Sequence, residues 1–596
     1  MSSLCGICGF TGQNNRELLR RMNNRIEHRG PDGDGFFEDS GISLGHRRLK
    51  IIDLSEKGKQ PMCNEDGNIW VTFNGEIYNY MELRGQLESR GHKFRSATDT
   101  EVIVHAYEEY GENCAALFDG MFAFALWDVK QKKLVLARDP LGKKPLYYSV
   151  VDGQIFFASE IKALLENPEL KRRMNKAAVG QLLNFRAVLG NETMFERIYK
   201  VLPASYLVWQ NGKKTEQKYW QLIIREDISD EEAAAKRFLQ LFDAAIEKRL
   251  MSDVPLGTYL SGGVDSSAIT ALMSKKVDGL RTFTVGFGEE GDELGYARAV
   301  AEKFSTEHTE VIVDYKDMTK LLPKLVWHMD EPMADIAFIP MYFLTHTARN
   351  DITVSLLGEG SDEMFAGYER YRKTTGIGRF APQGIVANDY LQTDMAFREN
   401  ERKAVVADKR LPGGLSGTVG RYFTKGSFLN NALRFDAQEI LPNYQLMRVD
   451  KVTMSCGLEA RAPFLDRQLA EFAFSLRPEL KVRGKTGKYI VKRAMRGILP
   501  DSILDERKRI FFIPLKQWFN DSLKELSQRL LDKNTIGRRG LFSYNDIRSK
   551  YFLQGKGVFS NRYANQLLML SMIEIWHRTF IDSEKVPKNG ISLDSI

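Results

Sequence analysis

Short apolar segments separated by turn residues dominate the first third of the chain and predict strands there. Residues 122–129 and 133–137 are apolar and short, which is typical of strands buried in a core. Residues 71–73 form a similar segment. Asn74-Gly75 follows it directly and predicts a turn at the end of that strand.

A hairpin and two helices complete the pattern of this region. Residues 147–151 and 154–158 flank Asp152-Gly153, a strong signal for a two-residue hairpin. Helical segments are predicted over residues 80–90 and 101–110. Because strands follow one another with few helices between them, we expect an antiparallel α+β domain built as a layered sandwich.

The pattern changes to helical spacing after about Trp220. Ser229-Asp230-Glu231-Glu232 carries the capping chemistry that begins a helix. The apolar positions that follow recur at helical spacing and define one core face: Phe238, Leu241, Phe242, Ala245 and Ile246.

Strands and helices then alternate along the chain. The predicted strands end at Leu260 or cover residues 281–287, 310–313 and 352–357. Helices are predicted from Asp265 and over residues 293–304. This alternation predicts an α/β domain with a parallel sheet and crossover helices.

Most of the remaining chain is helical in pattern. Residues 375–420 are rich in Gly, Asn and charged residues and have no periodicity that assigns them to an element. At ~100–200 residues per domain, a chain of 596 residues requires at least two domains. We expect the first domain over residues 1–210 and the second over residues 211–596.

Composition excludes several classes of protein. Hydrophobic residues make up 43% and charged residues 27%, which excludes wholesale disorder. The net charge of +7 is small for this length and is compatible with anionic substrates such as ATP. It does not argue for a nucleic-acid partner, since nucleic-acid binding needs a clustered basic patch.

The compartment is predicted from what the chain lacks. Five scattered cysteines argue against a disulfide scaffold and for a reducing environment. Residues 1–4 carry no secretory signal, and no apolar run reaches the ~18 residues that span a bilayer. We therefore expect a cytoplasmic protein with no membrane partner.

The strongest single motif is Ser261-Gly262-Gly263-Val264-Asp265-Ser266-Ser267, which lies between a predicted strand and a predicted helix. Its glycines bring backbone N–H groups close to a ligand, and the helix N-terminus favours an anion. An acidic residue next to phosphate requires a cation, so Asp265 indicates Mg²⁺. A plain glycine turn with a serine cap would explain fewer of these coinciding features, so we favour phosphate binding.

A second cluster, Leu357-Gly358-Glu359-Gly360-Ser361-Asp362-Glu363, also lies where a strand ends and a helix begins. Its three carboxylates are costly to hold together without a cation, whereas an acidic helix cap needs only one of them. We therefore predict a metal and phosphate site here. Lys485 or Lys488 could reach a phosphate, but exposed lysines are usually only solvated, and from these residues alone we favour that interpretation.

The N-terminal region carries residues suited to amide chemistry. Cys5 is a candidate nucleophile, and Asn74-Gly75 could supply a side-chain and a backbone donor to an oxyanion. An Arg for a carboxylate together with acids for an ammonium group would suit a free amino acid. Taken singly, a buried structural cysteine and a plain Asn-Gly turn explain these residues equally well.

Matched as a whole, the two motif sets resemble the glutamine-hydrolysing asparagine synthetase family. The first half resembles class II glutamine amidotransferase domains, which implies an Ntn-hydrolase-like sandwich. The second half resembles the synthetase domain with its pyrophosphate loop, an adenine nucleotide alpha hydrolase-like fold. The resemblance covers most of the chain in the expected order.

The resemblance implies roles in the first half. Cys5 would attack the side-chain amide of glutamine, with its own α-amine as the base once it is the mature N-terminal residue. Asn74 and Gly75 would hold the oxyanion. The glutamine-binding residues would be Arg48 for the α-carboxylate, Asn74, and Glu76 and Asp99 for the ammonium. Ammonia would then pass inside the protein to the second site.

The resemblance also implies a synthetase site that adenylates an acid, so that ammonia displaces AMP. Asp265 and Asp362 would hold Mg²⁺, and Glu359 would serve the amide-forming step. Lys488 matches the family lysine that contacts the activated carboxylate, and Arg461 could be structural or could touch substrate. The implied ATP-binding residues are Leu260, Ser261, Gly262, Gly263, Asp265, Ser266, Ser267, Val285, Leu357, Gly358 and Lys488. The family also implies a homodimer.

Two departures from the family pattern leave questions open. Residues 1–4 precede Cys5, so we expect either cleavage of a short leader or a true start at Leu4, the place of the family's initiator Met. Ala337 replaces a position that is commonly Ser near the acid pocket. Aspartate is the expected acid, and another carboxylate, such as a sugar acid or a biosynthetic intermediate, remains the alternative.

Overall fold

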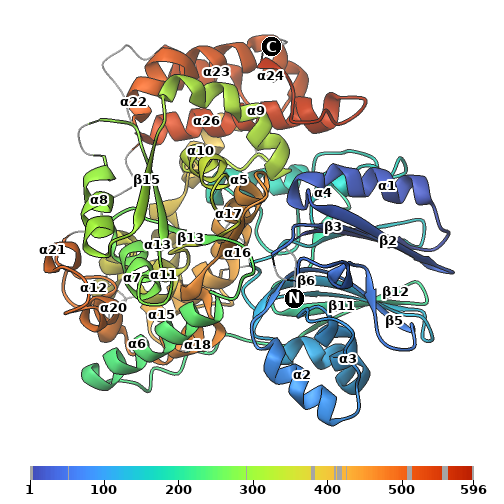
Figure 1. The fold of residues 1–596 in the computed structure, drawn as a ribbon. Helices are drawn as coiled ribbons and strands as arrows, with labels where there is room; N and C mark the ends of the chain where they lie inside the picture. Colours follow the sequence, from blue (N-terminus) through green and yellow to red (C-terminus); the bar gives the residue numbers. More distant parts are fainter. Residues whose placement is uncertain are drawn as a thin grey trace.

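Two regions of different architecture make up the chain (Figure 1). The computed structural model describes residues 5–51, 53–289, 292–377, 383–408, 411, 419–423, 426–506, 513–553 and 561–593. Residues 1–4, on which the expected processing before Cys5 depends, lie outside this description. Among the described residues, no helix combines the length and apolar character needed to cross a membrane.

The N-terminal region contains two six-stranded sheets. The first has the order β10-β8-β9-β1-β3-β2, and the second the order β12-β11-β7-β6-β5-β4. The strands of the first sheet are β1 (Cys5–Thr11), β2 (Gly33–Asp39), β3 (Ile42–Arg48), β8 (Tyr147–Val151), β9 (Gln154–Ala158) and β10 (Tyr199–Lys200). Those of the second are β4 (Met62–Cys63), β5 (Ile69–Ile77), β6 (Gly120–Asp128), β7 (Lys133–Arg138), β11 (Ser205–Gln210) and β12 (Lys213–Lys218).

These sheets form the middle layers of a four-layer sandwich (Figure 1). Helices α1 (Arg16–Arg25) and α4 (Ile161–Leu164) cover the first sheet, whereas α2 (Tyr80–Ser89) and α3 (Glu101–Tyr110) cover the second. One apolar core fills the space between the sheets, and another lies between the second sheet and its helices. The predicted antiparallel layered sandwich is thus confirmed, together with its 147–158 hairpin.

The predicted turn at Asn74-Gly75 is wrong. Strand β5 continues through both residues to Ile77, with Asn74 opposite Ala123 and Gly75 opposite Phe122 on β6. A long partner strand extends the ladder past a pair of residues that would favour a turn in isolation. The predicted domain boundary at residues 210 and 211 falls within the turn of the β11–β12 hairpin.

The second region is built on a five-stranded sheet in which every neighbouring pair is parallel. Its order is β15-β14-β13-β16-β17. The strands are β13 (Leu256–Tyr259), β14 (Arg281–Gly286), β15 (Glu307–Ile312), β16 (Val354–Leu356) and β17 (Glu459–Arg461). The predicted parallel α/β sheet is therefore confirmed.

The strand order reverses between β13 and β16. The chain runs from β13 outward through β14 and β15, then returns to place β16 on the other side of β13. Ligands bind open parallel sheets beyond the carboxyl ends of the strands at such a reversal. Both motifs singled out from the sequence, 261–267 and 357–363, follow these two neighbouring strands.

Helices surround the sheet and fill most of the remaining chain (Figure 1). Asp230 caps α6 (Glu231–Lys248) by accepting from Ala233 N at 2.9 Å, as its sequence predicts. The further helices are α5 (Lys176–Phe185), α7 (Val264–Met273), α8 (Leu294–Lys303), α9 (Met318–Met329), α10 (Phe338–Ala348), α11 (Ser361–Phe365), α12 (Glu369–Ile377), α13 (Gln383–Asp394), α14 (Glu399–Val405), α15 (Phe428–Phe435), α16 (Leu441–Asn443), α17 (Gln445–Met454), α18 (Arg467–Ser475), α19 (Pro478–Lys481), α20 (Tyr489–Ala494), α21 (Asp501–Leu504), α22 (Leu515–Trp518), α23 (Lys524–Leu530), α24 (Lys533–Arg539), α25 (Tyr544–Ile547) and α26 (Asn561–Trp576).

Helix α17 joins the two regions (Figure 1). Its Asp450 forms buried ion pairs with Arg29 at 2.8 Å and with Lys144 at 3.1 Å, both from the N-terminal region. A buried charge is tolerated only when it is paired, so these contacts fix the two regions against each other.

Candidate functional sites

Cys5 is buried at the start of β1, next to β5 of the other sheet. Its Sγ donates to the carbonyl oxygen of Phe73 at 2.6 Å, and its backbone N donates to Asn74 Oδ1 at 3.3 Å. The second contact orients the Asn74 amide. Asn74 Nδ2 is consequently buried with no hydrogen-bond partner among the described residues. An unpaired buried donor costs free energy unless a ligand accepts from it.

The Cys5 thiol is protonated in this environment. Burial raises the pKa of the thiol well above its ordinary value, and the positive charges of Arg29 and Lys144 offset this only in part. The nucleophile of a thiol reaction is the thiolate, so the site needs a base that takes the proton.

Gly75 is required by a close approach between two strands. A Cβ atom at this position would lie 2.1 Å from the carbonyl oxygen of Met121 and 2.6 Å from the Cα of Phe122. Only glycine lets β5 and β6 come this near. Gly75 of the Asn-Gly pair therefore permits the close approach of two strands and does not form the turn that was expected.

Two of the other residues predicted to bind glutamine, Arg48 and Asp99, lie near this site. Arg48 is opposite Cys5 in the β1–β3 ladder, and its guanidinium donates to the carbonyl oxygens of Ser55 and Asp53 at 2.9 and 2.6 Å. Asp99 accepts from the backbone N of Ile77 at 2.8 Å. These contacts fix Arg48 and Asp99 next to the strands that carry Cys5 and Asn74.

Glu76 connects the first site to the second region. Its carboxylate forms an ion pair with Arg461 of β17 at 3.3 Å, with both side chains fully buried. Arg461 also pairs with Glu459 and donates to the carbonyl oxygens of Arg249 and Met251 at 2.7 and 2.6 Å. Of the two roles considered for Arg461, these contacts favour the structural one, at the interface of the regions.

The glycine-serine loop lies between β13 and α7, as its sequence predicts. Ser261 and Ser266 contact each other through their hydroxyls at 3.1 Å, and Gly263 N donates to Ser261 Oγ at 3.3 Å. Gly262 has a φ of +75°, and a Cβ there would lie 2.5 Å from that of Tyr296. Ser267 Oγ is buried with no hydrogen-bond partner among the described residues. The loop thus presents hydroxyl donors at a helix N-terminus, which suits phosphate.

Other residues predicted to line the nucleotide site are buried along the same strands. Leu260 N donates to the carbonyl oxygen of Phe283 at 2.8 Å, and Val285 follows on β14. Leu357 N donates to the carbonyl oxygen of Arg461 at 2.8 Å. Gly358 packs against Asp265, and a Cβ at Gly358 would lie 2.9 Å from the Cβ of Asp265.

Lys488 lies between the two aspartates predicted to bind metal. Its Nζ pairs with Asp362 Oδ1 at 2.9 Å and with Asp265 Oδ2. Burial alone would lower the pKa of the Lys488 ammonium, but the two carboxylates outweigh burial and raise that pKa above its ordinary value. The reading of Lys488 as a merely solvated surface lysine is therefore wrong.

The donor set of this cluster suits Mg²⁺. Asp265 and Asp362 converge on one point, and Ser361 Oγ donates to Asp265 Oδ1 at 2.8 Å. Carboxylate and hydroxyl oxygens beside a phosphate loop are the ligands that Mg²⁺ takes together with nucleotide phosphates.

The three carboxylates of the second motif have separate partners. Asp362 pairs with Lys488, and Glu359 pairs with Arg448 at 2.8 Å. Glu363 accepts from Tyr368 Oη at 2.7 Å and from Gln445 Nε2 at 3.1 Å. Burial and the neighbouring charge of Asp362 raise the pKa of Glu363 to about 7.

Arg448 is a functional candidate that sequence reasoning missed. Besides Glu359, Arg448 pairs with Asp335, which lies two positions before Ala337. Asp335 in turn accepts from Ala337 N at 3.0 Å. No sequence pattern joins these residues, because Arg448 lies 89 positions from Glu359 and 113 from Asp335.

A cavity lies between the two regions, beside Glu359. Residues of both regions line it: Met121, Lys143 and Lys144 from the first, and Leu357, Glu359, Leu446, Val449, Asp450, Ala460, Arg461 and Ala462 from the second. Glu359 therefore faces a space that the cysteine-bearing region also borders.

Comparison with known proteins agrees with this arrangement. The asparagine synthase family model matches residues 237–578, and the glutamine amidotransferase domain model matches residues 4–220. The chain is 33% identical to glutamine-hydrolysing asparagine synthetase 1 of Bacillus subtilis (strain 168), over 98% of both chains. It is 31% identical to asparagine synthetase 3 of the same organism, over 85% of this chain and 86% of the relative. It is 30% identical to a glutamine-hydrolysing asparagine synthetase of Triphysaria versicolor, over 92% of this chain and 84% of that one. The chain therefore belongs to the asparagine synthase family, with a glutamine amidotransferase domain in its N-terminal region.

Proposed function

We propose that this chain is a glutamine-dependent asparagine synthetase whose two sites act in series. Glutamine is hydrolysed beside Cys5, and the ammonia reacts with an activated aspartate beside Glu359. The observation that carries the proposal is the cavity between the regions, which both regions line and which Glu359 faces. The relatives named above support aspartate as the acid and give no support to another carboxylate.

The glutaminase step follows from a neutral, buried thiol. The α-amine of a mature N-terminal Cys5 takes the thiol proton, and Sγ attacks the side-chain carbonyl of glutamine. The proton passes to the leaving amide nitrogen, so ammonia departs and a γ-glutamyl thioester remains for water to hydrolyse to glutamate. Asn74 Nδ2 and Gly75 N–H hold the oxyanion, and the unpartnered state of Asn74 Nδ2 supports this role.

The ends of glutamine are held by charged groups. Arg48 binds the α-carboxylate, and Asp99 and Glu76 face the α-ammonium. The fixed positions of Arg48 and Asp99 support this assignment. Glu76 also neutralises Arg461, so it links substrate binding to the interface between the regions.

In the synthetase step, an aspartate carboxylate attacks the α-phosphorus of ATP and pyrophosphate leaves. The loop from Ser261 to Ser267 binds the pyrophosphate portion. Leu260, Val285, Leu357 and Gly358 line the rest of the nucleotide site. Asp265 and Asp362 would hold Mg²⁺, which supplies positive charge to the phosphate oxygens when bound.

Ammonia then attacks the acyl carbon of the aspartyl adenylate and displaces AMP. Glu359 takes the proton that the attacking nitrogen loses, and Lys488 contacts the activated carboxylate. The position of Glu359 at the cavity supports its role. The location of Lys488 between the two aspartates of the nucleotide site supports its contact with the activated carboxylate.

The assay that tests this function measures all products at once. Purified protein is incubated with ATP, Mg²⁺, aspartate and glutamine, and the products are measured by mass spectrometry. We expect glutamate, asparagine, AMP and pyrophosphate. Glutamate without asparagine or AMP would contradict aspartate as the acid, and a set of sugar acids would be tried next. We also propose a homodimer in the cytoplasm, as the family resemblance implies, and light scattering on the purified chain tests the dimer.

A further inference from the structure

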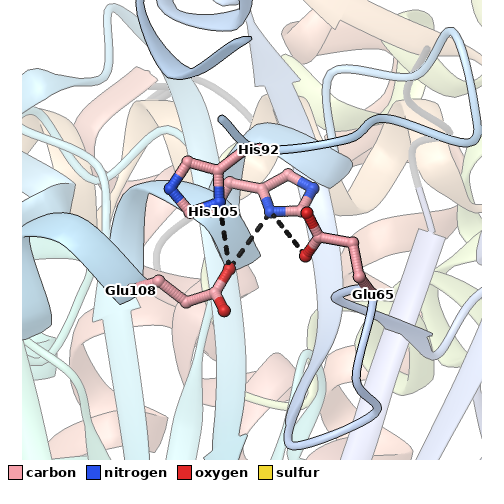
Figure 2. Close-up of side chains that lie close together, drawn as sticks. All are labelled: Glu65, His92, His105 and Glu108. Carbon is pink, nitrogen blue, oxygen red and sulfur yellow. Dashed lines mark hydrogen bonds and ion pairs between the residues drawn. The ribbon is translucent and has the colours of Figure 1, made fainter. Parts of the chain in front are cut away.

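A cluster of two histidines and two glutamates lies on the helical side of the N-terminal region (Figure 2). Glu65 comes from the segment between β4 and β5, and His92 follows α2. His105 and Glu108 are three residues apart on α3, so they share one face of that helix. The four residues each direct one possible ligand atom to a common point, with all four atoms within 4.8 Å of one another.

The separations suit a tetrahedral ion. His105 Nδ1 lies 3.1 Å from Glu108 Oε2 and 3.5 Å from Glu65 Oε2, and His92 Nδ1 lies 3.5 Å from Glu108 Oε2. Nitrogen and oxygen ligands about 2.0–2.1 Å from zinc lie about 3.4 Å from one another. Three of the ligand separations are thus already near the required value.

The outer oxygen of each carboxylate accepts a hydrogen bond from a neighbouring group. Glu65 Oε1 accepts from the backbone N of Lys93 at 2.7 Å, which leaves Oε2 directed to the cluster. Glu108 Oε1 accepts from Asn64 Nδ2 at 2.7 Å, with Oε2 likewise directed inward. Each glutamate therefore presents one fixed oxygen.

The two imidazoles have carboxylates on their outer nitrogens. His92 Nε2 donates to Glu109 Oε1 at 3.1 Å, and His105 Nε2 lies 3.8 Å from Glu101 Oε1. Metal-binding histidines characteristically direct the other ring N–H to a carboxylate, which fixes the tautomer and the ring orientation. Glu65, Glu108 and His92 thus have hydrogen-bonded outer partners of the type that supports a metal ligand, whereas Glu101 lies near His105 Nε2 without a hydrogen bond to it.

We propose that Glu65, His92, His105 and Glu108 bind a zinc-like divalent transition-metal ion. Two imidazole nitrogens with two carboxylates favour such an ion over Mg²⁺ or Ca²⁺, which take oxygen ligands. His105 is buried whereas Glu108 is exposed, so the site is closed on one side and can be reached from solvent on the other.

Metal binding here would stabilise the segment that leads to the glutamine site. The ion would link the segment after β4, the segment after α2 and the middle of α3. Asp99, which accepts from Ile77 N, lies at the start of that helix. We expect the ion to be structural, since all four ligands come from the protein and none is a group of the glutaminase site.

The alternative is that the cluster is held together by ion pairs alone. Four glutamates then surround the two histidines, and among the described residues Arg90 pairs with one of them, Glu109, at 2.7 Å. Removing a carboxylate would relieve repulsion in that case, whereas it would remove a ligand if a metal binds.

Zinc content and affinity distinguish the two. The full chain is treated with chelator, incubated with ZnCl₂ in the absence of ATP, and dialysed, and its zinc is measured by plasma mass spectrometry. We expect one zinc per chain and a zinc-dependent rise in melting temperature. With Co²⁺ in place of zinc, we expect the visible absorption bands of tetrahedral coordination.

Variants identify the site. Glu65→Gln and His92→Gln are expected to abolish stoichiometric zinc retention, and Glu109→Gln is expected to weaken binding roughly 10–100-fold. Matched controls are Glu17→Gln and His346→Gln, at exposed positions outside the cluster, which are expected to bind zinc as the original chain does.

Two results would overturn the proposal. One is an unaltered chain that retains no zinc. The other is zinc retention that Glu65→Gln and His92→Gln leave unchanged, which would place the metal elsewhere, for example at Cys5. Measurements on the unaltered chain do not depend on whether any variant folds, and none of these outcomes depends on asparagine synthesis.

Discussion

The two sites of this chain differ in how they prepare for their ligands. The proposed glutaminase site is built around a protonated thiol and an unpartnered amide N–H, both buried and both uncharged. The synthetase site is built from charges that already have partners, with Lys488 between two aspartates and Arg448 between two carboxylates. The thiol and the amide N–H of the first site have no ion pair to give up when an amide binds, whereas the second site must exchange ion pairs for ligand contacts.

Two buried lysines show why the charges of the second region need partners. Lys488 faces Asp265 and Asp362, and these carboxylates raise the pKa of its ammonium. Lys481 is as buried, but it donates to the neutral Asn430 Oδ1 at 2.7 Å, and burial lowers its pKa to about 7. Burial alone neutralises an ammonium, and a carboxylate in contact keeps it charged.

The largest expected effect is loss of the nucleophile. We expect Cys5→Ala to reduce glutamine-dependent asparagine synthesis roughly a thousandfold or more, because no other group forms the thioester. With ammonium chloride as the nitrogen source, the same variant should synthesise asparagine at the original rate. Equal losses with both nitrogen sources would show that the two sites are not separable.

Lys488→Met is the matching test in the second region. It leaves Asp265 and Asp362 without their cation, and we expect synthesis with either nitrogen source to fall roughly 10²–10³-fold. Glutamine hydrolysis should be unchanged when measured as glutamate release. Lys485→Met is the control. Lys485 lies three positions from Lys488 but is exposed, so its substitution should have no effect. A similar loss in both variants would contradict the assigned role.

Glu76→Gln tests the connection between the regions, with a smaller effect. It leaves the buried Arg461 with one neutralising partner fewer. We expect the ratio of asparagine formed to glutamine hydrolysed to fall by a factor of roughly 3–10, because the buried contact between the regions is weakened.

The reference for this measurement is Glu112→Gln, which removes an ion pair with Lys133 inside the N-terminal region. A higher KM for glutamine at an unchanged product ratio would assign Glu76 to substrate binding alone.

Lys481→Met is expected to leave turnover unchanged and to alter only the pH dependence of stability. The folded pKa of about 7 lies below the unfolded value, so the unfolded chain binds the extra proton between pH 7 and about 10.5. The unfolding free energy of the original chain therefore rises across that range, by a few kcal/mol.

Melting temperatures of both proteins at pH 7 and pH 9.5 measure this. The stability of Lys481→Met relative to the original chain should decrease as the pH rises. A difference that does not depend on pH would contradict the lowered pKa.

Local sequence patterns predicted helices, strands and turns, whereas contacts between residues far apart in the chain could not be predicted from the sequence. The hairpin at 147–158, the cap at Asp230 and the loop before α7 depend on neighbours within a few positions, so the sequence carries their signal. The turn predicted at Asn74-Gly75 failed because the partner strand β6 decides that conformation. Helices α13 and α14 lie in the stretch that no periodicity assigned, while residues 378–382, 409–410 and 412–418 of it are outside the described residues.

The candidate sites divide in the same way. Family motifs located Cys5, Asn74, the phosphate loop and Glu359. The partners that set their chemistry come from distant parts of the chain, as with Arg461 and Glu76, 385 positions apart. Burial converts such pairs into fixed contacts, and only the folded chain shows which groups are buried together.

The most direct test of the central claim follows the nitrogen atom from one site to the other. The unaltered chain is supplied with ATP, Mg²⁺, aspartate, amide-¹⁵N glutamine and an excess of unlabelled ammonium at a pH where little of it is ammonia. Internal transfer predicts asparagine that carries ¹⁵N in its amide, with one AMP for each asparagine. Asparagine that carries mainly ¹⁴N would show that the ammonia equilibrates with solvent, and it would contradict two sites joined by the cavity.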